Sequence, residues 1–375
     1  MKSIYVTLLL FSFLVIGCTK DKKQNTELTK PSSSVKYAKG FDIITSDNYK
    51  KLIITSPYQN SKKTFEYFIT TKKNKDAPLI NELVVPVREI VVTSTTHIPM
   101  IELLEEEHTI VGFPFSNYIS SKKTRKRIDD GLITEIGKET SLNTEIILNL
   151  DPDLVVGYSI TNLDKSLTVI QKSGVNVIYN GDWLEETPLG RAEWIKFFGV
   201  LFNKEKEANR IFNEIETNYL EAKKIAKKIE NNPTILSGAI MNKGIWNLPA
   251  GGSFVAQFLK DANINYIWSH TKGKGSLSLS IESVFDKAAD ADFWIAPGYF
   301  YSKEQMIAYH KIYKEFNAFK KDEIYSAALK KGKTGGIIYY ELAPTRPDLV
   351  LKDIIKIIDR NLLPDYKMTF FEKMK

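Results

Sequence analysis

The sequence predicts an α/β protein built from two lobes, each a mostly parallel sheet flanked by helices. One long backbone helix joins the lobes, and a small β appendage lies at the N-terminus. Strand and helix patterns alternate from residue 88 onward, which is typical of parallel sheets covered by helices. The alternation stops in residues 204–230, which contain no Gly or Pro, and then resumes. A short motif around Glu145 returns around Glu282, once on each side of that stretch.

The first residues have the pattern of an export signal. Lys2 is followed by an apolar run from Ile4 to Ile16 and then by Cys18, the only cysteine in the chain. This run is shorter than the roughly 20 residues that a membrane-spanning helix needs, but it suits the core of a signal peptide. The residues before Cys18 are similar to the lipobox of bacterial lipoproteins. We therefore expect residues 1–17 to be a signal peptide and Cys18 to carry a lipid; an ordinary signal peptide with an incidental cysteine is the alternative.

Residues 18–39 are rich in Lys, Ser and Asn and read as a solvated tether between the lipid and the folded part. They hold much of the formal charge of +7, and about +2 is left for the chain from Gly40 onward. The folded part is thus close to neutral, and the sequence carries no nucleic-acid-binding signature. We expect a protein of the cell envelope that faces the periplasm and binds no nucleic acid.

Residues 40–182 are expected to form the N-terminal lobe together with the β appendage. Short strand patterns separated by turn-forming residues predict the appendage between residues 41 and 70. The lobe itself follows, with strands expected in residues 89–93, 109–113, 154–157 and 175–179.

Residues 183–232 are expected to form a helical linker. A first helix is predicted over residues 188–202, and a longer one over residues 204–230, where apolar residues recur at helical spacing. Residues 233–375 then form the C-terminal lobe. Its strands are expected in residues 234–240, 293–296, 324–326 and 336–340, with a closing helix over residues 349–358.

Enzymatic motifs are lacking. The four histidines have no paired spacing of the kind used for zinc, and neither a GxSxG elbow nor a Walker loop occurs. Pro249–Ser253 has the pattern of a glycine-containing turn capped by Ser253, without a dinucleotide fingerprint. We interpret His97 as structural. The sequence predicts no catalytic residue, no metal site and no covalently bound cofactor.

The repeated motif places a glutamate at the start of a helix in each lobe. Asn143 and Ser280 are the expected N-caps, two residues before Glu145 and Glu282. Acidic residues are favoured there by the helix dipole alone, by about 0.3–1 kcal/mol. The alternative is that these exposed carboxylates meet basic residues of a partner protein.

Aromatic residues are frequent after the predicted strand ends, where open α/β sheets bind ligands. Such rings suit flat or bulky apolar molecules, although core packing is the alternative for any one of them. Arg346 could supply a cation for a carboxylate-bearing ligand. The candidate ligand-cleft residues are Phe115, Tyr158, Trp183, Trp246, Tyr299 and Arg346.

As a set, these segments resemble the substrate-binding lipoproteins of ABC importers for iron–siderophores, haem and cobalamin. The resemblance covers roughly Arg88 to the C-terminus and rests on REIVVTSTTH at Arg88, NTE at Asn143, LDPDLVV at Leu150, PAGGSF at Pro249 and SLSIE at Ser278. It implies two α/β lobes bridged by a rigid helix. It also implies that one glutamate on each lobe, here Glu145 and Glu282, docks onto arginines of the permease membrane subunits.

The chain departs from that family in two ways. The β appendage lies outside the common pattern, and Glu139 and Ser276 stand where cobalamin-binding members carry tryptophans. We therefore expect a monomeric, lipid-anchored solute-binding protein that carries an iron complex, a siderophore or haem, to an ABC permease. The alternatives are a cobalamin-binding protein of the same family, an exported enzyme, and an adhesion or structural lipoprotein that uses its appendage.

Overall fold

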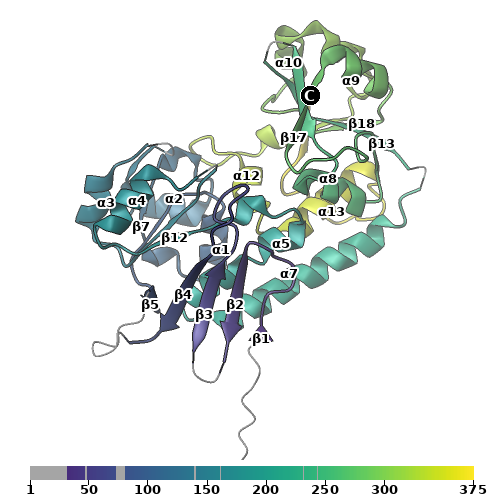
Figure 1. Cartoon of the computed structure of the whole chain (residues 1–375). Coiled ribbons are helices and arrows are strands. Elements are labelled where there is room, and N and C mark those ends of the chain that lie inside the picture. Colours follow the sequence, from purple (N-terminus) through teal and green to yellow (C-terminus); the bar gives the residue numbers. More distant parts are fainter. Residues whose placement is uncertain are drawn as a thin grey trace, which may run out of the picture.

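Two lobes lie side by side above one long helix in the computed structural model (Figure 1). The structure describes residues 32–375, apart from residues 47–48, 73–80, 139–140, 161, 231 and 243. The expected signal peptide and Cys18 lie outside the described residues. In the part of the chain that is described, no helix is both long and apolar enough to cross a membrane.

The N-lobe is built on a five-stranded parallel sheet in the order β12-β11-β6-β7-β8. Strands β6 and β11 inside the sheet and the edge strand β12 are buried along their whole length because helices cover the sheet. Its strands are β6 (Ile90–Val92), β7 (Ile110–Phe113), β8 (Thr134–Glu135), β11 (Leu154–Gly157) and β12 (Val177–Tyr179). Its helices are α1 (His97–Leu103), α2 (Lys122–Asp129), α3 (Thr144–Leu150) and α4 (Lys165–Lys172), and β9 (Gly137–Lys138) pairs with β10 (Ser141–Leu142) before α3.

The C-lobe has a sheet in the order β16-β13-β18-β19-β20, parallel except for β20, and a second antiparallel sheet, β14-β15-β17. The strands of the two sheets are β13 (Thr234–Ser237), β14 (Ala239–Asn242), β15 (Ile245–Pro249), β16 (Asn265–Tyr266), β17 (Ser276–Ser280), β18 (Phe293–Ile295), β19 (Ile324–Ser326) and β20 (Glu372–Lys373). The helices are α8 (Phe254–Asp261), α9 (Ile281–Ala288), α10 (Lys303–Tyr309), α11 (Asn317–Lys320), α12 (Ile338–Leu342) and α13 (Pro347–Ile358).

The backbone helix α7 spans Glu205–Ala226 and belongs to both lobes. Ala208 and Ile215 pack into the N-lobe core, whereas Tyr219 and Ala226 pack into the C-lobe core. At about 1.5 Å per residue it is about 33 Å long, enough to link the two cores. The preceding helix is divided into α5 (Pro188–Ala192) and α6 (Ile195–Leu201), so the prediction of one helix over residues 188–202 is wrong.

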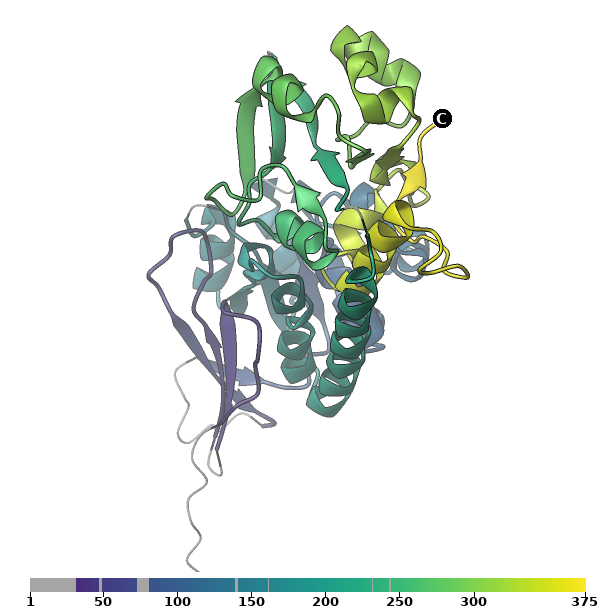
Figure 2. The same cartoon turned by 90° about the vertical axis from the view of Figure 1, so that its right-hand side faces the viewer.

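The appendage is a five-stranded sheet in chain order that shares the N-lobe core. Figures 1 and 2 show it against the lower side of the N-lobe, with one loop rising toward the gap between the lobes. Its strands are β1 (Ser32–Ser33), β2 (Phe41–Thr45), β3 (Lys50–Ile54), β4 (Phe65–Thr70) and β5 (Glu82–Val84).

The end of the predicted tether is bound to the protein. The buried carboxylate of Glu193 accepts hydrogen bonds from the backbone N–H groups of Lys36, Tyr37 and Ala38. Glu185 accepts those of Lys39 and Gly40. For residues 36–39 the prediction of a solvated tether is therefore wrong, because two carboxylates of the helical linker accept their backbone N–H groups.

The predicted strand over residues 336–340 is also wrong. Residues 338–342 form α12, which follows a turn containing Gly335 and Gly336. A short apolar run such as Ile337–Tyr340 fits either a strand or a helix, and its length does not decide between them.

Candidate functional site

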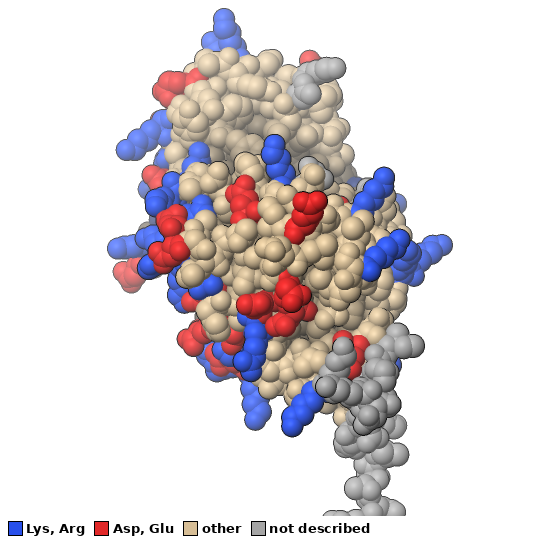
Figure 3. Space-filling model, turned by 90° about the vertical axis from the view of Figure 1, so that its left-hand side faces the viewer, with Lys and Arg blue, Asp and Glu red and all other residues tan. Residues whose placement is uncertain are grey.

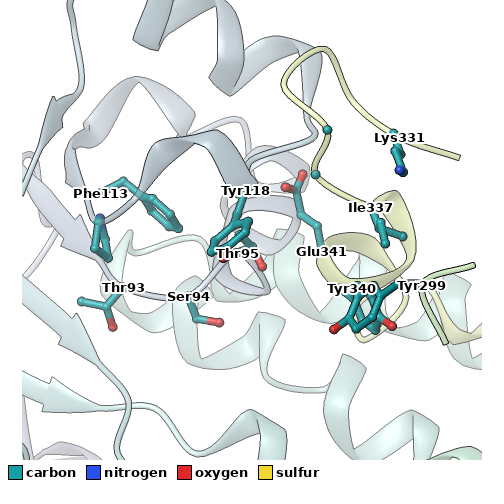
Figure 4. Close-up of a pocket in the computed structure, with 13 residues that line it drawn as sticks. Thr93, Ser94, Thr95, Phe113, Tyr118, Tyr299, Lys331, Ile337, Tyr340 and Glu341 are labelled. Carbon is teal, nitrogen blue, oxygen red and sulfur yellow. The ribbon is translucent and has the colours of Figure 1, made fainter. Parts of the chain in front are cut away.

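A cavity of about 570 Å³ opens between the two lobes. Its N-lobe wall comes from the turn Thr93–Thr95 after β6 and from Phe113, Pro114 and Tyr118 after β7. Its C-lobe wall comes from Tyr299 after β18, from the segment around Lys331 and from α12 (Figure 4). Both walls therefore lie at the carboxyl ends of parallel strands, where open α/β sheets bind ligands. The volume is in the range of small-molecule pockets.

Two exposed tyrosines face this cavity from opposite lobes. The side chain of Tyr118 is 55% exposed and that of Tyr299 is 60% exposed. Each ring packs on a second ring: Tyr118 on Phe115 at 4.6 Å and Tyr299 on Tyr340 at 5.9 Å between centroids. Burial raises the pKa of Tyr340, which keeps it a neutral phenol. Paired rings on both walls suit a bulky or planar ligand.

Lys331 is a cation on the C-lobe wall. Its ammonium lies 5.4 Å from the centroid of the Tyr301 ring. An ammonium supported by an aromatic face can also attract an anionic ligand.

The loop Lys331–Ile337, called here the clasp loop, crosses from the C-lobe onto the N-lobe. At Gly332 and Gly336 an added Cβ would overlap the backbone of Ser120 and of Tyr118. The hydroxyl of Thr334 donates to the Asn117 carbonyl at 2.8 Å, and Arg125 donates to Thr334 at 3.2 Å. Backbone therefore lies against backbone, and the two lobes are joined on one side of the cavity.

Glu341 completes this junction from α12. Its carboxylate is 3% exposed and accepts the backbone N–H groups of Ser120 at 2.6 Å and Ser121 at 2.9 Å. Burial raises the pKa of Glu341 to about 7, an effect that these N–H donors oppose and that the nearby Glu102 reinforces. A carboxyl group that bridges the lobes thus changes charge near neutral pH.

A second buried group lies behind the N-lobe wall. His97 is fully buried, and burial lowers its pKa to about 4, so the ring is neutral. It packs against the Phe198 ring at 5.5 Å, and neither ring nitrogen has a hydrogen-bond partner among the described residues. Next to it, the Thr96 hydroxyl donates to Asp182 at 2.6 Å. The interpretation of His97 as a structural residue agrees with this packing.

The residues expected to line the cleft divide into three groups. Tyr299 lines the cavity and Phe115 supports Tyr118 beside it. Tyr158 follows β11 but is not among the residues that line this cavity, and Trp183 lines a different one. The other two predictions are wrong, as described next.

Trp246 and Arg346 do not reach the cavity. Trp246 is fully buried and packs on Trp294 at 5.3 Å, because β15 directs it into the C-lobe core. Arg346 precedes α13, and its guanidinium binds the carboxylate of Asp348 with two hydrogen bonds of 2.9 and 2.8 Å. Sequence reasoning missed Lys331, Tyr340 and Glu341 as lining residues, and it placed Tyr340 in a predicted strand over residues 336–340.

The two glutamates of the repeated motif stand in matching local structures. Each follows the end of an antiparallel strand, β10 or β17, and lies in the first turn of a helix, α3 or α9. The N-caps are Asn143 and Ser280, which accept the N–H groups of Ile146 and Ser283 at 3.1 and 3.2 Å. Both glutamates are exposed, and the backbone N–H of Glu282 together with Ser280 holds the pKa of Glu282 below its usual value.

The face of the molecule in Figure 3 carries acidic side chains in its central part. Basic side chains lie mainly toward its edges, and the coloured residues form no continuous basic patch on this face. Over the described ranges, no group of three or more His, Cys, Asp or Glu residues is placed to hold a metal ion.

Comparisons with known proteins agree with this architecture. Residues 90–328 match the family model described as periplasmic binding protein. An uncharacterized lipoprotein of Methanocaldococcus jannaschii is 25% identical over 99% of this chain and 95% of its own length. The petrobactin-binding protein of Bacillus subtilis shares the fold with a TM-score of 0.56 and 16% identity, over 82% of this chain and 97% of its own.

The periplasmic haem-binding protein of Vibrio cholerae shares the fold as well, with a TM-score of 0.54 and 15% identity over 70% of this chain and 99% of its own. The family model covers well over half of the present chain and includes residues from both walls of the cavity, from Thr93 to Tyr299. The chain is a member of the periplasmic binding protein family.

Proposed function

We propose that this protein is a lipid-anchored solute-binding protein that captures an iron complex, a siderophore or haem, in the inter-lobe cavity and delivers it to an ABC permease. The observation that carries the proposal is the cavity between the carboxyl ends of both sheets, in a chain of this family. Solute-binding proteins hold their ligand between two lobes, and the permease performs the energised step.

The chemistry of the walls favours an iron complex. The ring pairs of Tyr118 and Tyr299 offer apolar faces from both lobes, and Lys331 adds a positive charge. Haem and many ferric siderophore complexes combine a bulky aromatic body with carboxylate or other anionic groups. Ligand classes of this kind are named for two of the proteins that share the fold, which bind petrobactin and haem.

Docking on the permease is assigned to Glu145 and Glu282. Both carboxylates are exposed at helix starts, one on each lobe, and can pair with basic residues of the membrane subunits. Attachment to the membrane is assigned to a lipid on Cys18, and the protein acts as a monomer outside the cytoplasm.

Titration with defined ligands tests the proposal. Haemin, ferrioxamine, a ferric tris-catecholate, ferric citrate and cyanocobalamin are each titrated into the purified protein by calorimetry, with the iron-free siderophores as controls. We expect saturable one-to-one binding of at least one iron complex and at least tenfold weaker binding after Tyr118→Ala combined with Tyr299→Ala. Tyr49→Ala, an exposed tyrosine of the appendage, is the matched control. Binding of cyanocobalamin alone, or of none of these ligands, contradicts the proposed function.

A further inference from the structure

A second cavity of about 570 Å³ lies beside the first and is walled in part by the appendage. The appendage contributes the tip of the loop between β3 and β4, Ser56–Ser61, called here the appendage loop. The linker contributes Trp183–Glu186 and Arg191, and the C-lobe contributes Lys274 and Gly275. Three parts of the molecule thus converge on one cavity.

The two cavities are neighbours. Thr95 lines the first, and the next residue, Thr96, donates its hydroxyl to Asp182 at 2.6 Å. Trp183, which follows Asp182, lines the second. This hydrogen bond therefore joins a residue next to the lining of the first cavity to a residue next to the lining of the second.

The appendage loop is held in place by its backbone. A Cβ on Gly181 would overlap the carbonyl oxygen of Ser56, so the base of the loop lies directly on the segment that precedes the linker. At the tip, the Gln59 N–H donates to the Ile160 carbonyl at 3.0 Å, and the Ser61 N–H donates to the Tyr58 carbonyl at 3.1 Å. The side chains of the tip are therefore presented to the cavity by a fixed backbone, which is a property of binding loops on rigid scaffolds.

The lining is polar and includes a side-chain hydrogen-bond donor that is unpaired in the described part of the chain. The indole N–H of Trp183 is buried and has no hydrogen-bond partner among the described residues. Burying an unpaired donor costs stability, and such a group calls for an explanation such as a missing partner. Tyr58, Gln59, Asn60 and Ser61 add hydroxyl and amide groups to the lining of the same cavity.

Arg191 closes the cavity on the linker side. It donates to the carbonyls of Trp183 at 2.7 Å and Glu185 at 3.2 Å, and its guanidinium lies 3.9 Å from the centroid of the Phe254 ring of the C-lobe. Lys274, which also lines the cavity, pairs with Glu186 at 2.5 Å. These contacts fix the Trp183 backbone and leave its N–H as the unpaired donor.

We propose that the appendage loop and Trp183 form a second compartment of the ligand site, which takes hydrogen-bond-accepting groups, carboxylate or amide carbonyl, at the periphery of the ligand. The appendage is then a selectivity element of the binding site. This inference depends on the proposed function, because it assumes that the bulk of the ligand occupies the first cavity.

Two variants test it against the ligand that binds best in the titrations above. Trp183→Phe keeps an aromatic ring and removes the N–H, and Tyr58→Ala with Gln59→Ala strips the loop tip. We expect affinity to fall about threefold to tenfold in the first and about tenfold or more in the second, the range for one or two lost hydrogen bonds. Tyr49→Ala, on the same appendage but outside the cavity lining, is expected to keep the wild-type Kd.

Tryptophan fluorescence gives an independent readout. Four of the five tryptophans, Trp194, Trp246, Trp268 and Trp294, are at most 2% exposed, whereas Trp183 is partly exposed. An acceptor group at Trp183 is expected to shift its emission, and this shift is lost in Trp183→Phe while calorimetry still detects binding.

The outcomes separate the two proposals. Wild-type affinity in both variants, with the emission unchanged on binding, overturns the second compartment and leaves the proposed function intact. Failure of the wild-type protein to bind any of the five ligands rejects the proposed function and this inference together. If the double variant does not fold by circular dichroism, Trp183→Phe alone decides.

Discussion

The two lobes build their walls of the ligand cavity by different means. The N-lobe wall follows directly from the ends of β6 and β7, as expected for a parallel sheet. Much of the C-lobe wall comes from the clasp loop and α12, which reach across and bind the N-lobe through backbone contacts. One wall is therefore set by local strand and turn patterns, and the other by contacts between distant parts of the chain.

The two helix-start glutamates, in contrast, have the same local structure in both lobes. Each stands in the first turn after a side-chain N-cap at the end of an antiparallel strand. The first prediction tests whether this similarity of Glu145 and Glu282 is functional. The next two concern buried titratable groups that differ between the two walls, Glu341 on the C-lobe side and His97 behind the N-lobe wall.

Reversing the charge at both glutamates is expected to have the largest effect, which is a loss of uptake. Glu145→Arg combined with Glu282→Arg places like charges against the basic permease residues that we propose as partners, which costs several kcal/mol at an interface. We expect uptake of the iron complex by cells to fall about 100-fold while the Kd of the purified protein stays unchanged. Glu221→Arg, on the exposed side of α7, is the control. Normal uptake by a folded double variant contradicts the docking role.

Glu341 is expected to give a stability loss with rising pH. Its pKa is about 7 in the folded protein and about 4.5 ordinarily, so folding favours its protonated form. Its contribution to stability is therefore present below pH 4.5 and is lost as pH rises through 7, at most about 3 kcal/mol in the free energy of unfolding.

Urea unfolding of Glu341→Gln from pH 4.5 to 8 measures this effect. The amide does not titrate, so the stability of the variant relative to wild type is expected to increase across that range. The exposed Glu282→Gln serves as the control. A difference between Glu341→Gln and wild type that does not change with pH contradicts the prediction.

His97 is expected to change the pH dependence of stability in the opposite direction to Glu341, and by a smaller amount. Its pKa is about 4 when folded and 6.5 ordinarily, so its contribution is present above pH 6.5 and is lost as pH falls toward 4. Between pH 7.5 and 5 the loss is about 2 kcal/mol. His97→Leu removes the titration, and its stability relative to wild type is expected to be greater at pH 5 than at pH 7.5, measured by urea unfolding. Equal differences at the two pH values would show that His97 does not titrate as proposed.

The sequence predicted those features that depend on local patterns. The backbone helix is visible because its apolar residues recur at helical spacing, and the fold class follows from alternating strands and helices. The placement of Glu145 and Glu282 follows from N-cap residues two positions earlier. Tyr299 could be placed because it follows a strand end.

Features that depend on contacts between distant residues could not be predicted in this way. Trp246 and Tyr299 are both aromatic residues near strands, and only the packing around Trp246 places it in the core. Glu341 bonds to Ser120 and Ser121, about 220 residues earlier in the chain, and no local pattern marks that pairing. For the same reason the appendage could be predicted as strands but not as a wall of a cavity.

The clasp loop also limits how the lobes can move. The backbone helix α7 joins them at one place, and the clasp loop with Glu341 joins them at another. Two lobes that are joined at two points can still rotate relative to each other about the line through those points. Sliding of one lobe past the other and twisting about any other axis are blocked. Ligand entry and release then correspond to a small swing about that axis, so a spectroscopic distance measured across the cavity should change along a single coordinate.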